Sequence, residues 1–294
     1  MAAGHPTSRP AVPPVAGIVL GGRVLNGEGA PVAPQERQMG LVFQSYSVWP
    51  HLTVRENVAF GLKLRRLPAA EIAARVDRIL ELMAIGALAE RRSWQLSGGQ
   101  LQRVALARTL VVEPRLVLFD EPLSNLDAKL REDLRSELRD LLVSLKITTL
   151  LVTHDQIEAM AIADRIAVMG KGSIAQIGIP REIYESPATR FVADFVGRSL
   201  WFEGEFKPGS GALPARFETK EGYSFEVAPP IRTASSYGLS IRPEHMHIVP
   251  RVDDANRLTA RVERIEFNGA EIVVHGRLDR TGRRISLPIR VEET

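Results

Sequence analysis

Asp120 and Glu121 form an acidic pair directly after the apolar run 116–119, and His154 follows a second apolar run, 147–152. Such runs without alternation are typical of strands that are buried on both faces of a parallel sheet. Open α/β sheets place their ligand sites at the carboxyl ends of these strands. An acidic pair there suits Mg²⁺ and an attacking water, because Asp120 can hold the metal through its water shell while Glu121 polarises the water. For each residue taken singly, a solvated strand end or a structural histidine is the alternative.

A second candidate site is the segment Ser97-Gly98-Gly99-Gln100, which the sequence places at the start of a helix. The two glycines let backbone N–H groups approach an anion without obstruction by side chains, and the helix N-terminus adds about half a positive charge. The segment is therefore suited to binding a phosphate group. The alternative is a plain helix start, with Ser97 as N-cap and the glycines as a flexible entry.

The sequence contains no Gly-x-x-x-x-Gly-Lys-Ser/Thr segment, the P-loop whose backbone N–H groups surround the phosphates of a nucleotide. The nearest match is Gly170-Lys171-Gly172-Ser173. It has Arg165 where the first glycine must lie, and Gly172 where a hydroxyl residue must follow the lysine.

Composition indicates a globular protein of two domains, because 294 residues can bury two cores and 45% of them are hydrophobic. The net charge of +3 gives little reason to expect a polyanionic partner such as nucleic acid. The absence of cysteine from the sequence favours a reducing cytoplasm. No apolar run approaches the ~20 residues of a membrane span, so we expect any membrane association to go through a partner.

The elements that must position these residues follow an α/β pattern. Residues 1–16 are rich in Ala and Pro and are predicted to be unstructured. Strands are expected at 18–20, 23–25, 40–43, 116–119 and 147–152, and helices over about 68–86, 103–112 and 126–145. From about residue 197, alternating strands at 200–206, 223–227, 237–241, 259–267 and 270–275 predict a separate all-β domain, plausible as a small barrel.

Two details of this β region can be tested against a structure. Asn268-Gly269 is a strong two-residue hairpin signal. His245 and His247 would share a strand face and could bind a metal, although exposed polar side chains on a β surface are the favoured interpretation.

Taken together, five segments in this order resemble the ATP-binding subunits of ATP-binding cassette (ABC) transporters. The resemblance covers about residues 17–294. The segments are VFQSYSVWPHLTVRENVAFGL with Gln44 (the Q-loop), LSGGQLQRVALARTL (the signature), LVLFDEP (Walker B), SNLD from Ser124 to Asp127 (the D-loop), and LVTHD with His154 (the switch histidine).

The resemblance implies ATP and Mg²⁺ as cofactors and a dimer in which each ATP lies between the P-loop of one subunit and the signature of the other. Glu121, His154 and Gln44 would be catalytic, with Gln44 and Asp120 near Mg²⁺ through water. Ser97, Gly98, Gly99, Gln100, Asp120 and Asp127 would be the nucleotide-binding residues. Permease subunits, a second ATPase subunit and, indirectly, a substrate-binding protein would be the partners, at the cytoplasmic face of the membrane.

The carboxyl-terminal part sharpens the subclass that the resemblance implies. SIRPEHMHIV, together with GIPREIYESPATRFVADFVG, is similar to importer ATPases that end in a TOBE-type, OB-like β domain, such as those serving sugars, ferric iron and polyamines. The expected fold is an incomplete P-loop NTPase (RecA-like) cassette at 17–196, with a helical subdomain at about 53–105, and a TOBE-type domain at 197–294.

In the family the P-loop precedes the Q-loop, in the part of the sequence that here reads MAAGHPTSRP. We therefore expect an amino-terminally truncated or frame-shifted importer ATPase, impaired for lack of the P-loop, with residues 1–16 outside the fold. One alternative is a non-catalytic subunit whose signature completes a partner's ATP site. Another is a nucleic-acid-associated cassette protein, which is disfavoured because the β strands lack a basic and aromatic platform.

Overall fold

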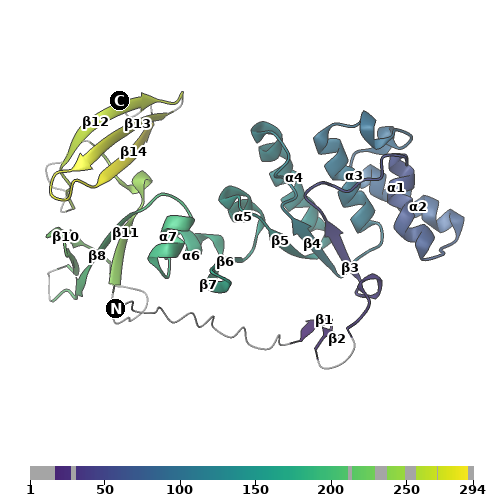
Figure 1. The fold of residues 1–294 in the computed structure, drawn as a ribbon, viewed down its shortest axis with the longest axis horizontal. Coiled ribbons are helices and arrows are strands. Elements are labelled where there is room, and N and C mark those ends of the chain that lie inside the picture. Colours follow the sequence, from purple (N-terminus) through teal and green to yellow (C-terminus); the bar gives the residue numbers. More distant parts are fainter. Residues whose placement is uncertain are drawn as a thin grey trace, which may run out of the picture. The chain divides into compact units, whose positions relative to one another are not determined.

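The computed structural model describes residues 17–27, 31–210, 214–228, 237–248, 256–269 and 271–290. Residues 1–16, predicted to be unstructured, lie outside these described residues. The chain divides into two compact units, one up to Ala163 and one from Asp164. Figure 1 labels most of the helices and strands and colours them along the sequence.

The first unit is built on a parallel sheet in the order β3-β4-β5, formed by Met39–Val42, Leu116–Asp120 and Thr148–Val152. All three strands were predicted to within two residues. Their carboxyl ends lie level, because Val42 is paired with Phe119 and Asp120 with Val152. The loops after the three strands therefore begin at one edge of the sheet, which positions the candidate site.

The described residues cover only one face of this sheet. The row Val42, Phe119 and Leu151 belongs to the hydrophobic core, whereas the neighbouring residues Leu150 and Val152 are 57% and 55% exposed. The prediction that the strand at residues 147–152, which is β5, is buried on both faces is therefore wrong. An unalternated apolar run does not reveal which of its faces a neighbouring element covers.

Helices cover the buried face and extend beside it (Figure 1). α3 (Gly98–Leu110) packs on β3 and on the pair α1 (Val54–Leu64) and α2 (Ala69–Leu82), and α4 (Ala128–Leu145) packs on α5 (Gln156–Ile162). A capping box of Thr53 and Glu56 begins α1, and Pro68 is the N-cap of α2. Leu134, Leu138 and Leu142 of α4 are buried.

Short elements complete the first unit. β1 (Ile18–Leu20) and β2 (Arg23–Asn26) form a small antiparallel pair. Single 3₁₀ turns are formed by Pro34–Glu36, Gly86–Leu88 and Ser93–Gln95.

The second unit begins with the hairpin β6 (Ile166–Gly170) and β7 (Ser173–Gly178), followed by α6 (Pro180–Glu185) and α7 (Arg190–Phe195). Its larger antiparallel sheet has the order β10-β9-β8-β11, from Ser224–Glu226, Arg216–Thr219, Leu200–Lys207 and Tyr237–Ile241. The other has the order β12-β13-β14, from Ala260–Phe267, Glu271–Leu278 and Arg284–Arg290. A core around Phe202, Phe217 and Phe225 includes Leu278 of β13, so the two sheets share it.

Three sequence predictions for this unit have clear outcomes. β12 and β13 pair antiparallel on either side of Asn268-Gly269, which confirms the hairpin, but Phe267 pairs with Ile272, so the connection is longer than the predicted two-residue turn. Gly170-Lys171-Gly172-Ser173 forms the β6–β7 turn, where Lys171 and Gly172 have φ of +51° and +79°, so this segment is a tight turn and not a phosphate loop. His245 ends the 3₁₀ turn Pro243–His245, so the expected strand face shared with His247 is wrong.

Candidate functional site

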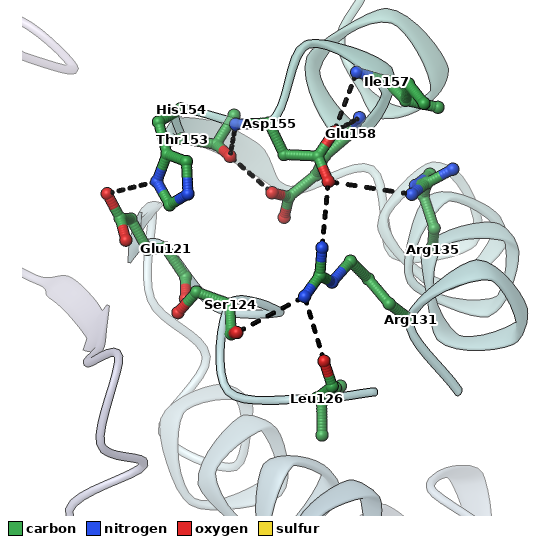
Figure 2. Close-up of polar contacts among 10 residues, drawn as sticks. All are labelled: Glu121, Ser124, Leu126, Arg131, Arg135, Thr153, His154, Asp155, Ile157 and Glu158. Carbon is green, nitrogen blue, oxygen red and sulfur yellow. Dashed lines mark hydrogen bonds and ion pairs between the residues drawn. The ribbon is translucent and has the colours of Figure 1, made fainter. Parts of the chain in front are cut away.

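The loops after β3, β4 and β5 bring Gln44, Glu121 and His154 together. Gln44 Nε2 donates to Glu121 Oε2 at 3.3 Å, and His154 Nδ1 lies 2.8 Å from Glu121 Oε1. Both oxygens of the Glu121 carboxylate are thus engaged by residues from the two neighbouring strand ends (Figure 2 shows the His154 contact). The three residues predicted to be catalytic do form one cluster.

The backbone around Glu121 holds this carboxylate in place. Glu121 has a φ of +46°, a left-handed conformation that non-glycine residues adopt at a cost of about 1–3 kcal/mol. Its N–H donates to Val152 O at 2.9 Å, and its carbonyl accepts from the hydroxyl and the N–H of Ser124. Asn125 Nδ2 donates to the Gln44 carbonyl at 2.7 Å and so connects the D-loop to the Q-loop. Asn125 was not among the predicted site residues, although it lies within the SNLD segment.

His154 is exposed, with 74% of its side chain accessible. The hydrogen bond to Glu121 and the negative charge of that carboxylate raise the pKa of His154 above its ordinary value. A raised pKa means that the contact with Glu121 is strongest while His154 is protonated, and that it weakens as the pH rises through the pKa of the folded state. Nδ1 faces Glu121, which leaves Nε2 as the nitrogen that a ligand can approach.

A partly buried polar network fixes the backbone that carries His154 (Figure 2). Asp155 is the N-cap of α5, and its Oδ1 accepts from the N–H groups of residues 157 and 158. Its other oxygen faces Arg131 at 3.4 Å and Arg135 at 4.0 Å. Thr153 Oγ1 donates to Glu158, whose pKa is raised by burial. None of these partners was predicted, because nothing in the spacing of residues 131 and 155 reveals their contact.

The signature segment Ser97–Gln100 forms the first turn of α3, as predicted. Ser97 and Gln100 make a reciprocal capping box: Gln100 N–H donates to Ser97 Oγ, and Ser97 N–H donates to Gln100 Oε1. The glycines allow close packing, since a Cβ on Gly98 would lie 3.2 Å from a methyl group of Leu126 and one on Gly99 would lie 3.4 Å from Leu130. Among the described residues, the polar partners of Ser97 and Gln100 are each other, and the Glu121 cluster takes no part in this turn.

Asp120 and Asp127 were the other predicted nucleotide-binding residues. Asp120 is exposed at the end of β4. Asp127 is the N-cap of α4 and accepts from Leu130 N–H at 3.0 Å, so its carboxylate already has a structural role. Within the described part of the chain, no group of three or more His, Cys, Asp or Glu side chains is arranged to hold a metal ion. In the same residues, no helix is both long and apolar enough to cross a membrane.

Comparison with known proteins supports the family resemblance. The ABC transporter family matches residues 12–124 and the TOBE domain family matches residues 239–291. The first match begins inside the segment 1–16 that the sequence analysis set outside the fold. The chain is 43% identical over 263 residues to the sn-glycerol-3-phosphate import ATP-binding protein UgpC of Cereibacter sphaeroides, covering 89% of this chain and 71% of that protein.

A second relative is the spermidine/putrescine import ATP-binding protein PotA of Mesorhizobium japonicum. It is 44% identical over 269 residues, which cover 90% of this chain and 72% of the relative. Identity at this level over most of both chains, with the cassette fold and a TOBE domain, leaves one assignment: the chain belongs to the ATP-binding subunits of ABC importers, the ATPases that drive uptake.

Proposed function

We propose that this chain is the ATP-hydrolysing subunit of a solute importer and that Glu121 is its catalytic base. The observation that carries the proposal is the position of the Glu121 carboxylate, which Gln44 and His154 hold from both sides at the carboxyl edge of the sheet. Each neighbour has a suitable free group: His154 can offer Nε2 to the terminal phosphate, and Gln44 can offer its amide oxygen to Mg²⁺ or water.

The donor set fits Mg²⁺-ATP on the side of the terminal phosphate. Asp120 and the amide oxygen of Gln44 are hard oxygen ligands that suit Mg²⁺ through its water shell. Bound Mg²⁺-ATP would supply the phosphoryl group and the charge-neutralising cation. Glu121 would then accept a proton from the attacking water, while His154 and Gln44 fix its orientation.

The same residues do not supply a phosphate cradle. A P-loop contributes several charge-assisted hydrogen bonds, and removing about four of them at ~1.5 kcal/mol each weakens binding by about 10⁴-fold. We therefore propose that the 294-residue polypeptide alone binds Mg²⁺-ATP too weakly for calorimetric detection. Tight binding by the unmodified chain would contradict this.

A chimera tests the role of Glu121. An amino-terminal segment that contains a Gly-x-x-x-x-Gly-Lys-Ser/Thr P-loop is joined before Gly17, and ATP hydrolysis is measured. We expect hydrolysis, and a loss of at least about 100-fold in the chimera with Glu121→Gln. Glu132→Gln, an exposed residue on α4, is the isosteric control and should retain full activity. Undiminished hydrolysis by the Glu121→Gln chimera would exclude Glu121 as the base.

A second function is supported by the intact capping box of the signature segment, which the chain keeps without its own P-loop. In this case the chain donates Ser97, Gly98 and Gly99 to an ATP held by a partner subunit, with Asp127 aligning the two subunits. Ser97→Asp separates the two functions, because Asp retains the N-cap but places a negative charge where the phosphate would lie. The chain is mixed with an ABC ATPase subunit that contains a P-loop, and ATP hydrolysis is compared with that of the subunit alone. If the chain donates its signature, it increases the hydrolysis. Ser97→Asp in the chain should then remove this increase, and Glu121→Gln in the chain should not.

The remaining assignments follow from the importer family and are part of the same proposal. The chain would dimerise with a second ATPase subunit and bind permease subunits, meeting a substrate-binding protein only through them. It would lie at the cytoplasmic face of the membrane and have no nucleic-acid partner. The names of the relatives include a glycerol phosphate and polyamines, and the solute of this chain stays undecided between such classes.

A further inference from the structure

The backbone that leads away from Gln44 is strained. Tyr46 and Ser47 have φ of +59° and +47°, so two consecutive non-glycine residues lie in the left-handed region. Tyr46 N–H donates to Phe43 O at 3.0 Å and Ser47 N–H to Ser45 O at 2.7 Å, which are only local contacts. Such a conformation persists only where the surroundings impose it.

One side chain from a distant part of the sequence supplies that restraint. Arg108, in the last turn of α3, donates through Nη1 to the carbonyl of Ser47 at 2.6 Å and through Nη2 to the carbonyl of Tyr46 at 3.1 Å. Its guanidinium also lies 4.7 Å from the centre of the Trp49 ring. The planar guanidinium can donate to both carbonyls at once, which the single ammonium group of lysine cannot reproduce in the same geometry.

Both ends of this loop are anchored elsewhere. Fully buried Asn57 accepts from Trp49 N–H at 2.9 Å and donates to Trp49 O at 3.1 Å, which ties the far end to α1. At the end nearer to β3, Asn125 donates to the Gln44 carbonyl, and the Gln44 side chain donates to Glu121. The strained pair between these anchors is therefore the part whose geometry decides where Gln44 points.

We propose that Arg108 is a positioning residue for the ATPase site: it holds the loop 44–49 in its strained form, keeps Gln44 on Glu121, and makes the Q-loop move together with the signature helix α3. The inference rests on the proposed function of Glu121 and adds a residue that has no contact with the cluster itself. The same helix begins with Ser97-Gly98-Gly99, so a displacement of α3 by a nucleotide at its N-terminus reaches the Q-loop through Arg108 at its other end.

Amide hydrogen exchange on the unmodified chain and on Arg108→Lys tests the restraint without any nucleotide. We expect the amides of Tyr46 and Ser47 to exchange about tenfold faster in Arg108→Lys, because hydrogen bonds from a charged group are lost. The exchange rates of amides in β4 and α4 should be the same in both proteins. Arg103→Gln is the control on the same helix, since Arg103 donates to Met83 O and pairs with Glu137 rather than contacting the loop. Equal exchange in the loop of the wild type and Arg108→Lys would overturn the proposal.

A compensating substitution distinguishes strain from general destabilisation. Ser47 is exposed and its φ of +47° is a conformation that glycine adopts readily, so Ser47→Gly should restore most of the lost protection in Arg108→Lys. A merely structural arginine predicts no such recovery, and its absence would count against the proposal. If Arg108→Lys does not fold, NMR on the wild type can measure rotation about the Cζ–Nη bonds of Arg108 instead. Slowed rotation supports the restraint, and free rotation excludes it.

The chimera with a P-loop gives the functional measurement. Arg108→Lys should lower kcat about tenfold and leave KM for ATP within about twofold, since only the orientation of Gln44 changes. Ser47→Gly should recover part of this loss, and an unchanged kcat would contradict the proposal. If the unsubstituted chimera does not hydrolyse ATP, the proposed function fails, while the exchange experiment still decides whether Arg108 restrains the loop.

Discussion

At the scale of single residues, the Glu121 carboxylate is the centre of the site. One of its oxygens accepts from Gln44 and the other contacts His154, so each neighbour is oriented by the same group. The left-handed backbone of Glu121 directs the side chain to this position. A base held in this way is oriented before any ligand arrives, which reduces the reorganisation needed during the reaction.

The raised pKa of His154 offers a direct check on this contact. Because the hydrogen bond and charge of Glu121 are the main causes, Glu121→Gln should lower the pKa of His154 relative to the wild type. The pKa is measured by NMR titration of the imidazole signals. The control Glu132→Gln removes an exposed carboxylate on α4, away from this contact, and should leave the titration of His154 unchanged. Identical His154 titrations in Glu121→Gln and the wild type would show that the contact does not form in solution.

The residues of the site could be named from the sequence, but their contacts could not. Glu121 and His154 follow two predicted parallel strands, so their proximity could be expected from the sequence, whereas Gln44 was placed with them only by the family resemblance. Arg108 and Asn125 act through backbone carbonyls, and a carbonyl contact leaves no signature in the residue types on either side. The backbone strain at residues 46 and 47 was equally invisible, because neither is a glycine.

At the scale of elements, the contact between β3 and α3 determines how the Q-loop is presented. Gly40 lies in β3 against Thr109 of α3, and a Cβ on Gly40 would come within 2.3 Å of the Thr109 methyl carbon. α3 therefore packs on β3 closely enough that only glycine fits at residue 40. This contact lies near the base of the loop that Arg108 holds.

Gly40→Ala should consequently lower the free energy of unfolding by about 1–3 kcal/mol through overpacking. Thr109→Ser removes the methyl group and keeps the hydroxyl that donates to Ala105 O, so adding it should recover much of the loss. The control is Gly86→Ala, where a Cβ would meet nothing within 4 Å and the change should stay within about 0.5 kcal/mol. Urea denaturation followed by circular dichroism measures all four chains, and a fully stable Gly40→Ala variant would contradict the packing.

The strands of the parallel sheet were predictable because their apolar runs are strong signals, whereas their surroundings were not. The strands β6, β7, β9 and β14 were missed, and α1 was predicted only as part of a helical subdomain. The apolar run 147–152 was correctly assigned as a strand, yet only one of its faces is covered. The short helices α5, α6 and α7 were missed, since six or seven residues hold too little periodic signal. The domain boundaries 1–16, 17–196 and 197–294 stay predictions, and the compact units separate after Ala163.

At the scale of the whole molecule, one face of the sheet β3-β4-β5, left uncovered by the described residues, bears on behaviour in solution. Leu41, Leu118 and Leu150 lie in one row across the three strands, and Leu41 and Leu150 are exposed. Val152 and Phe43 continue the apolar surface toward the candidate site. Contiguous apolar surface of this kind promotes association, and a strand with an open edge adds unpaired backbone groups.

We expect the unmodified chain to self-associate through this face, and the double substitution Leu150→Thr and Val152→Thr to reduce the association. Threonine keeps the preference for a strand while removing apolar surface, so the free energy of unfolding should change by less than about 1 kcal/mol. Sedimentation velocity over a range of concentrations gives the association state. Leu151→Thr, on the same strand but packed on the core, is the matched control: it should destabilise the fold by about 1–3 kcal/mol. If the double variant associates as strongly as the wild type, another surface is responsible.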